Sequence, residues 1–218
     1  SFGSAIYRFR PDGSELQVLG SLPGNQAGIG FDEMGLAFAS AATTGQPSNY
    51  LAIPAPEYDS IDSLPSNGYT TNIAEQNRFL PATDRVRQVD WHGEYTAAAG
   101  QSVYTARQYP EKYWNSATFV SDGTGHLLGS FFKEPDGAGF TAPNPHNVAS
   151  STDAWVSPTY SYVGPDGIVW FADLYEYIFQ HNPTPSGFEN GEGNAYETML
   201  RDKQYTRLYR LTYGDNSQ

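Results

Sequence analysis

The sequence contains no cysteine, and this absence excludes several kinds of site. Disulfides, iron–sulfur clusters, thiolate zinc sites and covalently attached c-type haem all need Cys side chains, so none of them can form within this chain. We therefore expect no covalent haem here, and a haem domain would have to be a separate partner. The absence does not indicate a cellular compartment.

Basic residues are scarce as well. The chain has 12 Lys and Arg against 24 Asp and Glu, which gives a formal net charge of −12. Such a chain is repelled by phosphate backbones and anionic lipid surfaces, so we expect no nucleic-acid partner. The acidic composition suits solubility, cation binding or a neutral ligand, and we expect the ligand to be a small molecule or a carbohydrate.

Long apolar runs are also missing. No stretch approaches the about 18 consecutive apolar residues that a transmembrane helix needs, and no signal-peptide pattern is present. The chain opens on SFGSAIYRFRPDG, which is a strand-and-turn pattern. We expect no membrane span, and either a mature form or a chain that begins inside a longer protein.

What the sequence does contain indicates strands. There are 16 Tyr, 12 Phe and 4 Trp, together with 22 Gly and 15 Pro, a composition that favours strands joined by many turns. From Ala5, the stretch AIYRFR alternates in polarity, PDG predicts a turn, and ELQVL predicts the returning strand.

One motif occurs three times, as FDEMGLAFAS, FVSDGTGHLLG and VGPDGIVWFAD. It consists of an apolar strand end, an acidic turn with Gly and a second apolar strand. The three copies begin at Phe31, Phe119 and Val163, so the spacings are 88 (119 − 31) and 44 (163 − 119) residues. A period of about 40–50 residues is typical of β-propellers with four-stranded blades. We predict an all-β propeller with about five blades' worth of chain; a β-sandwich with coincidental PDG turns is the alternative.

Residues 1–218 are interpreted as one propeller domain or a part of one. The segment 43–88 lacks the repeat and is predicted to be a long loop insertion, and 174–205 a long loop between two blades. LYRLTYGD, from Leu208, echoes IYRFRPDG, from Ile6, and predicts the start of a further blade. Because a propeller ring must close, we expect another segment or chain to complete a larger propeller.

The sequence resembles a known family, most strongly from Asp90 to Leu211. The likeness is carried by WHGEYTAAAGQSVYTARQYPEKYWNSATFVSDGTGHLLGSFFKEPDGAGF, NPHNVASSTDAWVSP, VGPDGIVWFADLYEYIFQHNPTP and GNAYETMLRDKQYTRLYRL. These segments resemble the membrane-bound dehydrogenase proteins of planctomycetes, verrucomicrobia and related bacteria, which are relatives of the glucose/sorbosone dehydrogenase propellers.

The resemblance implies an exported propeller, which is periplasmic, on the cell surface or secreted. It also implies oxidation of a sugar or alcohol by pyrroloquinoline quinone (PQQ), with a calcium ion, a histidine base and arginines near the quinone. Family members often carry a haem-binding CxxCH domain, and this sequence has no CxxCH motif. No catalytic set is carried over from the family, so the residue roles below rest on side-chain chemistry.

Candidate catalytic residues are His92, His146 and Arg201. Histidine is the usual base for taking a hydroxyl proton during hydride transfer, and an arginine would stabilise the negative charge of the reduced cofactor. The alternatives are a loop histidine bonded to backbone for His92 and a turn scaffold for His146. Asn144 and Asn147, which flank His146, would also suit a polar pocket.

Candidate cofactor- or substrate-binding residues are Arg107, Asp153, Trp155 and His181. In STDAW, Trp155 would stack on a pyranose face while Asp153 binds hydroxyl groups. The alternative for Asp153 is a cap on the backbone of its own turn. Arg107 is a further candidate to stabilise the reduced cofactor.

Candidate metal ligands are Asp173 and Asn182. Asp173 ends the apolar strand VWFAD, where a buried carboxylate needs a cation, an arginine or several donors. A calcium ion is one interpretation, because it prefers oxygen ligands, and a salt bridge with Arg201 is the other. The stretch from Phe171 to Lys203 is accordingly either a structural wrap across one face or the rim of a site.

Two hypotheses of function follow. The first is an exported quinoprotein-like dehydrogenase that oxidises a sugar or another alcohol. The second is a non-catalytic propeller that acts as a carbohydrate-binding or assembly module in a larger secreted or surface complex. A propeller hosts many functions, so the fold cannot decide between them.

Overall fold

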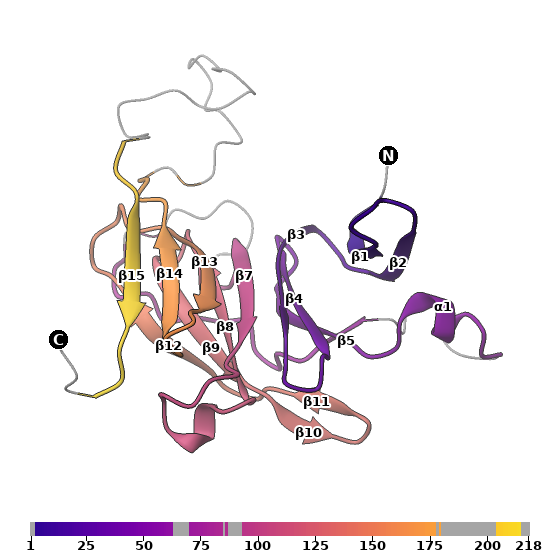
Figure 1. Cartoon of the computed structure of the whole chain (residues 1–218). Helices are drawn as coiled ribbons and strands as arrows, with labels where there is room; N and C mark the ends of the chain where they lie inside the picture. The colour runs from indigo at the N-terminus through magenta and orange to yellow at the C-terminus, as the bar shows by residue number, and fades with distance from the viewer. Residues whose placement is uncertain are drawn as a thin grey trace, which may run out of the picture.

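The computed structural model describes residues 3–62, 70–84, 86, 93–177, 179 and 204–214. Within these residues nearly all regular structure is strand (Figure 1). The strands are β1 (Ala5–Phe9), β2 (Leu16–Ser21), β3 (Asn25–Phe31), β4 (Ala37–Ala42), β5 (Gln46–Leu51), β6 (Thr70–Asn72), β7 (Ala98–Val103), β8 (Ala117–Asp122), β9 (Leu127–Phe132), β10 (Glu134–Asp136), β11 (Gly139–Thr141), β12 (Pro145–Ser150), β13 (Pro158–Val163), β14 (Val169–Asp173) and β15 (Arg207–Leu211). A short helix, α1 (Ala55–Tyr58), and a 3-10 turn, η1 (Glu111–Tyr113), lie in connections between strands. In the described part of the chain, no helix has the length and apolar character needed to cross a membrane.

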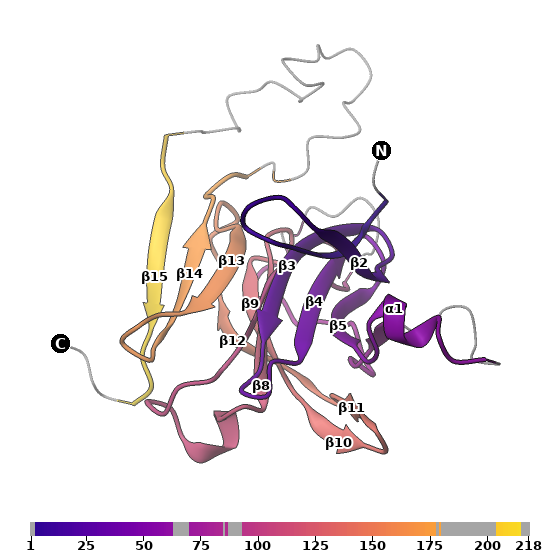
Figure 2. The same ribbon diagram turned by 45° about the vertical axis from the view of Figure 1, so that its right-hand side comes forward.

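The strands form three consecutive antiparallel sheets, here called the first, second and third. The first has the order β3–β4–β5–β6, the second β7–β8–β9–β12 and the third β13–β14–β15. The hairpin β1–β2 precedes the first sheet, and the hairpin β10–β11 lies in the connection between β9 and β12. The sheets stand side by side like the blades of a propeller (Figures 1 and 2). This confirms the predicted all-β propeller class.

The three sheets meet along their first strands. β3 packs against β7, and β7 packs against β13. Glycine permits this approach, since a Cβ on Gly28 would lie 2.3 Å from the backbone nitrogen of Gln101. A Cβ on Gly100 would lie 2.5 Å from the Cα of Tyr160. Adjacent blades therefore touch through their backbones, which only a residue without a side chain allows.

Two apolar clusters hold the sheets together. The cluster at the first and second sheets includes Phe38, Tyr50, Ile73, Tyr95, Val120 and Phe131, and the cluster at the second and third sheets includes Tyr104, Tyr109, Phe119, Leu128, Val169 and Phe171. Each fully buried side chain of this kind contributes about 1.5–3 kcal/mol through burial. β7 and β8 are buried along their whole length, because the second sheet lies between the first and third sheets and is covered on both faces.

A buried ion pair also joins the first and second sheets. Nζ of Lys133, just after β9, lies 2.7 Å from Oδ2 of Asp32, just after β3, and the two side chains are 5% and 1% exposed. The ammonium also lies 5.1 Å from the ring centroid of Phe38 and 4.5 Å from that of Phe140. Both charges are paired, as buried charges must be.

The predicted 44-residue spacing is wrong as a blade period. The first strands of the three sheets begin at Asn25, Ala98 and Pro158, which are 73 (98 − 25) and 60 (158 − 98) residues apart. The described residues form two four-stranded sheets, one three-stranded sheet and two hairpins. The turns after Phe31 and Val163 join first to second strands, whereas the turn after Asp122 joins second to third, so the motif does not mark equivalent positions.

The two predicted long loops are also corrected. The segment 43–88 contains β5 and β6, which form the outer half of the first sheet, so it does not replace a blade edge. β14 and β15, which flank the segment 174–205, pair within one sheet, and most of the segment itself lies outside the described residues. LYRL is therefore the third strand of the third sheet and not the start of a further blade.

Candidate functional site

Asp173 is the central polar residue at the end of β14. Its side chain is buried, and Oδ1 accepts hydrogen bonds from the backbone N–H groups of Ser157, at 2.6 Å, and Tyr175, at 2.8 Å. Ser157 immediately precedes β13, and Tyr175 follows β14. The carboxylate thereby ties together the segments that enter and leave the first two strands of the third sheet.

Asp122 occupies the equivalent position at the end of β8 in the second sheet. Oδ2 accepts from the backbone N–H groups of Thr96 and Ala97, while Oδ1 accepts from the N–H of Gly125 and the hydroxyl of Thr124, at 2.7–2.9 Å. Burial raises the pKa of Asp122, and these four hydrogen bonds oppose that rise. Sequence reasoning missed this residue; its signal was Asp at the end of an apolar strand, FVSD, as in VWFAD.

The two aspartates differ in their second oxygen. Both oxygens of Asp122 are hydrogen-bonded, whereas Oδ2 of Asp173 is buried with no hydrogen-bond donor among the described residues. Among the described residues, its ion-pair partner is Nη1 of Arg207, at 3.9 Å. Arg207 is the register partner of Asp173 on β15.

Arg207 and Tyr175 form a stacked pair above Asp173. The Arg207 guanidinium carbon lies 3.2 Å from the centroid of the Tyr175 ring, a cation–π contact. The hydrogen-bonding contact with Tyr175 and, less strongly, the charge of Asp173 raise the pKa of Arg207, so the guanidinium stays charged. The Tyr175 hydroxyl donates to Oδ2 of Asp153 at 3.0 Å, which brings a second carboxylate into the cluster.

Asp153 organises the turn that carries Trp155. Its N–H donates to Oγ of Ser151 and its Oδ1 accepts from the N–H of Trp155, both at 3.0 Å. The capping role that sequence analysis considered for Asp153 is therefore present. Its carboxylate also faces Tyr175, and each carboxylate oxygen keeps a further acceptor position.

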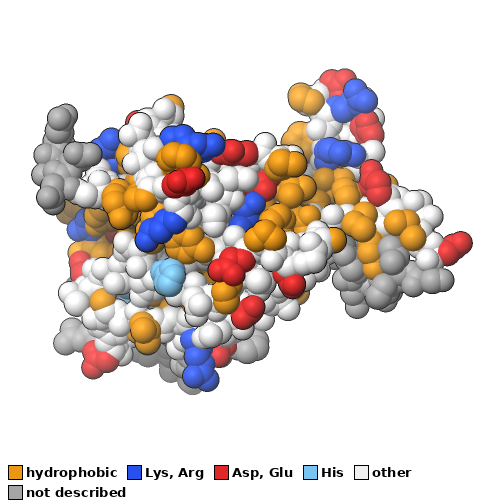
Figure 3. Space-filling model, turned by 90° about the horizontal axis from the view of Figure 1, so that it is seen from below, with side chains coloured by type: hydrophobic (Ala, Val, Ile, Leu, Met, Phe, Trp, Pro, Cys, Tyr) orange, Lys and Arg blue, Asp and Glu red, His pale blue; other side chains and the backbone are white. Residues whose placement is uncertain are grey.

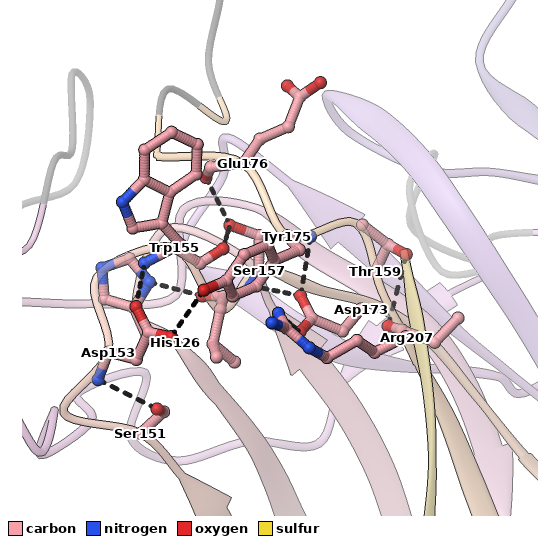
Figure 4. Close-up of polar contacts among 12 residues, drawn as sticks. His126, Ser151, Asp153, Trp155, Ser157, Thr159, Asp173, Tyr175, Glu176 and Arg207 are labelled. Atoms are coloured by element: carbon pink, nitrogen blue, oxygen red, sulfur yellow. Dashed lines mark hydrogen bonds and ion pairs between the residues drawn. The ribbon is translucent and has the colours of Figure 1, made fainter. Parts of the chain in front are cut away.

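Trp155, Tyr175 and Tyr177 form an aromatic surface beside these charges, of which Figure 4 shows Trp155 and Tyr175. The Trp155 ring lies 5.9 Å from the ring of Tyr175 and 5.8 Å from that of Tyr177, between centroids. Trp155 is partly exposed and lies at the edge of the group. We call the group of Asp153, Trp155, Tyr175, Tyr177 and Arg207 the aromatic–charged cluster.

A cleft of about 250 Å³ opens beside the same turn, between the second and third sheets. It is lined by His126, Leu127, Leu128, Ala149, Ser150, Ser151, Val156, Pro158, Phe171 and Tyr209. His126 is buried, and its Nδ1 lies 2.6 Å from the carbonyl oxygen of Val156. His126 lies in the turn between β8 and β9 and bridges to the segment before β13.

Three predicted residues meet at this end of the third sheet: Asp153, Trp155 and Asp173. Two others lie elsewhere. Arg107 pairs with Glu33 at 2.6 Å and stacks over Trp114, and His146 on β12 lines a separate cavity with Asn144 and Asn147.

The remaining predicted site residues, His92, His181, Asn182 and Arg201, lie outside the described residues. Ser157, Tyr175 and Arg207 were not predicted. Tyr175 lies two positions after Asp173, which is a local signal, but Arg207 reaches the site only through strand pairing. No histidine–arginine pair of the predicted catalytic kind is assembled among the residues that the structure describes.

The described residues do not fit the implied calcium ion or quinone. They contain no group of three or more His, Asp or Glu side chains placed to hold a metal ion. The buried Oδ2 of Asp173 faces Arg207, which already supplies a positive charge. A quinone with several carboxylates would need several cations, and in the described part of this cluster Arg207 is the cation present.

Residues 1–215 match the family described as "Domain of unknown function (DUF7133)". The chain belongs to this family. No curated protein matches the chain. Among solved structures, the PQQ-bound aldose sugar dehydrogenase of Streptomyces coelicolor is similar with a TM-score of 0.48 and 15% identity, over 83% of this chain and 48% of that one.

A glucose dehydrogenase-type oxidoreductase of Thermus thermophilus is also similar, with a TM-score of 0.43 and 14% identity, over 71% of this chain and 40% of that one. The chain thus spans less than half the length of either structure. At these values the likeness carries no inference about activity.

Proposed function

We propose that this protein binds a saccharide at the aromatic–charged cluster, as part of an exported propeller of the sugar-dehydrogenase type. The observation that carries the proposal is the position of Trp155 beside Tyr175 and Tyr177, with the Asp153 carboxylate hydrogen-bonded to Tyr175. The rings offer apolar faces and the charged groups offer donors and acceptors at the edge of the same surface.

This combination matches the chemistry of a sugar ring. The C–H groups on one face of a pyranose are apolar and weakly positive, so they pack against the negative face of an aromatic ring. The hydroxyl groups around the ring both donate and accept hydrogen bonds. Asp153 supplies acceptors and Arg207 supplies donors, so both needs are met beside Trp155.

The oxidation step is the less supported half of the proposal. It rests on the resemblance of the sequence to dehydrogenase propellers, because the described part of the aromatic–charged cluster contains no histidine and has Arg207 as its cation. Of the two candidate bases, His92 lies outside the described residues, and His146 lines the separate cavity away from this cluster. A non-catalytic saccharide-binding module would bind its sugar at the same cluster. The dehydrogenase and the binding module differ only in whether the bound sugar is oxidised.

One experiment tests both halves. The protein is titrated calorimetrically with a panel of aldoses and neutral oligosaccharides, and in parallel it is supplied with PQQ, Ca²⁺ and a redox dye and assayed with the same panel. Binding that is weakened at least tenfold by Trp155→Ala is expected. Binding without dye reduction would refute the dehydrogenase half and leave the binding module. No binding to any sugar would refute both.

A further inference from the structure

A larger cavity lies at the opposite end of the molecule. Its volume is about 760 Å³, within the range of about 300–1,000 Å³ that is typical of small-molecule sites. It lies where the outer strands of the second sheet approach the end of β15. Its lining is formed by Tyr109, Lys112, Tyr113, Ser116, Phe132, Glu134, Pro143, Asn144, His146, Asn147, Val148, Leu211, Thr212 and Tyr213.

Figure 3 views the molecule from below, with a histidine visible on this face among hydrophobic side chains and with charged groups of both signs nearby. Hydrophobic and charged side chains therefore lie next to one another on this face.

Aromatic side chains form the wall of the cavity. The ring of Tyr113 lies 5.1 Å from that of Phe132 and 6.0 Å from that of Tyr213, between centroids. His146 lies edge-on to Phe132 at 5.5 Å. Tyr213 is 49% exposed. Such a surface is costly to leave in water, so it favours a ligand with an apolar face.

The hydroxyl of Tyr109 takes no part in ligand binding. It donates to the carbonyl of Leu211 and accepts from the N–H of Val169, which occupies its donor and one acceptor position. Tyr109 is also buried at 4% exposure. It therefore fixes the wall by joining η1 to the third sheet, while the exposed residues around it stay available.

Four polar side chains at the rim lack partners within the part of the chain that the structure describes, whereas Asn147 donates from Nδ2 to the carbonyl of Leu80 and Ser116 donates from Oγ to the carbonyl of Lys133. Among the described residues, no hydrogen bond or ion pair is made by the side chains of Lys112, Glu134, Asn144 and His146. Lys112 makes only a contact over the Tyr113 ring, with Nζ 5.3 Å from its centroid. Polar groups that converge on an aromatic cavity without internal partners are available to a ligand.

The balance of these groups selects the ligand class. Lys112 is a donor, Glu134 an acceptor, and the Asn144 amide and the His146 imidazole supply both. One cation beside one carboxylate does not suit a phosphate, which takes several cations. Alternating donors and acceptors suit hydroxyl groups, each of which donates and accepts. We propose that this cavity is a second binding site, for a neutral oligosaccharide, distinct from the aromatic–charged cluster.

The test uses calorimetric titration of the whole protein with cellotriose, maltotriose and xylotriose. Tyr213→Ala and His146→Ala are expected to weaken binding of at least one of these sugars at least tenfold, and Asn144→Ala to weaken it severalfold. Tyr205→Ala is the matched control, because Tyr205 is 60% exposed and does not line the cavity. Circular dichroism checks that each variant is folded.

The outcomes separate this site from the one proposed above. If Tyr213→Ala weakens sugar binding and Trp155→Ala leaves it unchanged, the cavity is supported as the sugar site and the aromatic–charged cluster is refuted as one. The reverse pattern would refute the cavity. Absence of binding for all three sugars, or equal weakening in Tyr205→Ala, would also overturn the inference. Glucose 6-phosphate serves as the anionic comparison, and preference for it over the neutral sugars would contradict the assigned ligand class.

Discussion

Asp173 and Arg207 face each other across the β14–β15 pair, with Nη1 of the arginine 3.9 Å from a buried carboxylate oxygen that has no hydrogen-bond donor among the described residues. The arginine stacks on Tyr175 instead of closing on the aspartate. The same aspartate holds the backbone of Ser157 through its other oxygen. Asp173 therefore mainly holds the segments before β13 and after β14 together. Its negative charge also attracts Arg207 to the edge of the aromatic surface.

Asp122 and Asp173 occupy equivalent positions but accept different numbers of hydrogen bonds, so we predict that their removal lowers the free energy of unfolding by different amounts. Asp122→Ala leaves four buried donors without an acceptor, and Asp173→Ala leaves two. We expect the free energy of unfolding to fall by about 4 kcal/mol for Asp122→Ala and about 2 kcal/mol for Asp173→Ala. Urea unfolding measures both. Asp136→Ala, at an exposed position, is the control, and equal losses in the two buried variants would contradict the difference in hydrogen bonding between Asp122 and Asp173.

The backbone contact between β7 and β13 predicts a severe effect of Gly100→Ala. The new Cβ would collide with Tyr160, and Gly100 has a φ of +67°. Gly13 has a similar φ of +76° but no atom within 4 Å of the added Cβ, so Gly13→Ala reports the backbone cost alone. We expect Gly100→Ala to lower the free energy of unfolding by about 2 kcal/mol more than Gly13→Ala does, as measured by guanidinium unfolding. The same loss in both would show that β7 and β13 are not in contact.

The buried pair Lys133–Asp32 predicts non-additive mutations. Lys133→Met leaves the Asp32 carboxylate buried without its cation, and we expect a loss of about 3–5 kcal/mol in unfolding free energy. The double variant Asp32→Asn/Lys133→Met removes both charges and is expected to recover part of that loss. Urea unfolding of the two single variants and the double variant gives the coupling energy. A coupling near zero would rule out the pair as a link between the sheets.

The aromatic–charged cluster predicts a specific role for Trp155. Trp155→Ala is expected to weaken saccharide affinity at least tenfold, because it removes the stacking surface. Trp170→Ala is the matched control, since Trp170 is also a half-buried indole but bonds to Asp166 away from the cluster. Calorimetric titration measures both. Comparable weakening by the two variants would indicate general loosening of the third sheet.

The ion pair of Glu33 and Arg107 predicts a small pH dependence. The hydrogen bond from Arg107 lowers the pKa of Glu33 below its ordinary value of 4.5. The pair therefore stabilises the fold above about pH 4.5, and this contribution is lost as the pH falls through the lowered pKa.

Glu33→Gln should accordingly lower the urea midpoint slightly at pH 7 and make no difference in strong acid, where Glu33 is protonated in both states. High salt should shrink the difference at pH 7, because the pair is exposed. Glu111→Gln is the control for loss of an acidic side chain. A difference that persists unchanged at low pH would exclude the ion pair as its cause.

The sequence by itself determined the all-β class and the local parts of the candidate site. Alternating apolar residues and PDG turns predict strands and hairpins, because these depend on neighbours along the chain. Asp153 and Trp155 are two residues apart, so their proximity followed directly from STDAW. Asp173 was predicted as a buried carboxylate because it ends the apolar run VWFA.

Only the tertiary structure decided where each blade begins and which residues complete the site. Turn motifs of the same composition occur at different places in the sheets, so spacing alone misplaced the repeats. Arg207 meets Asp173 through the register of β14 with β15, and Gly100 meets Tyr160 through packing of two different sheets. Such contacts join residues far apart in the sequence, and hydrogen-bond register and close packing, which no local pattern records, determine them.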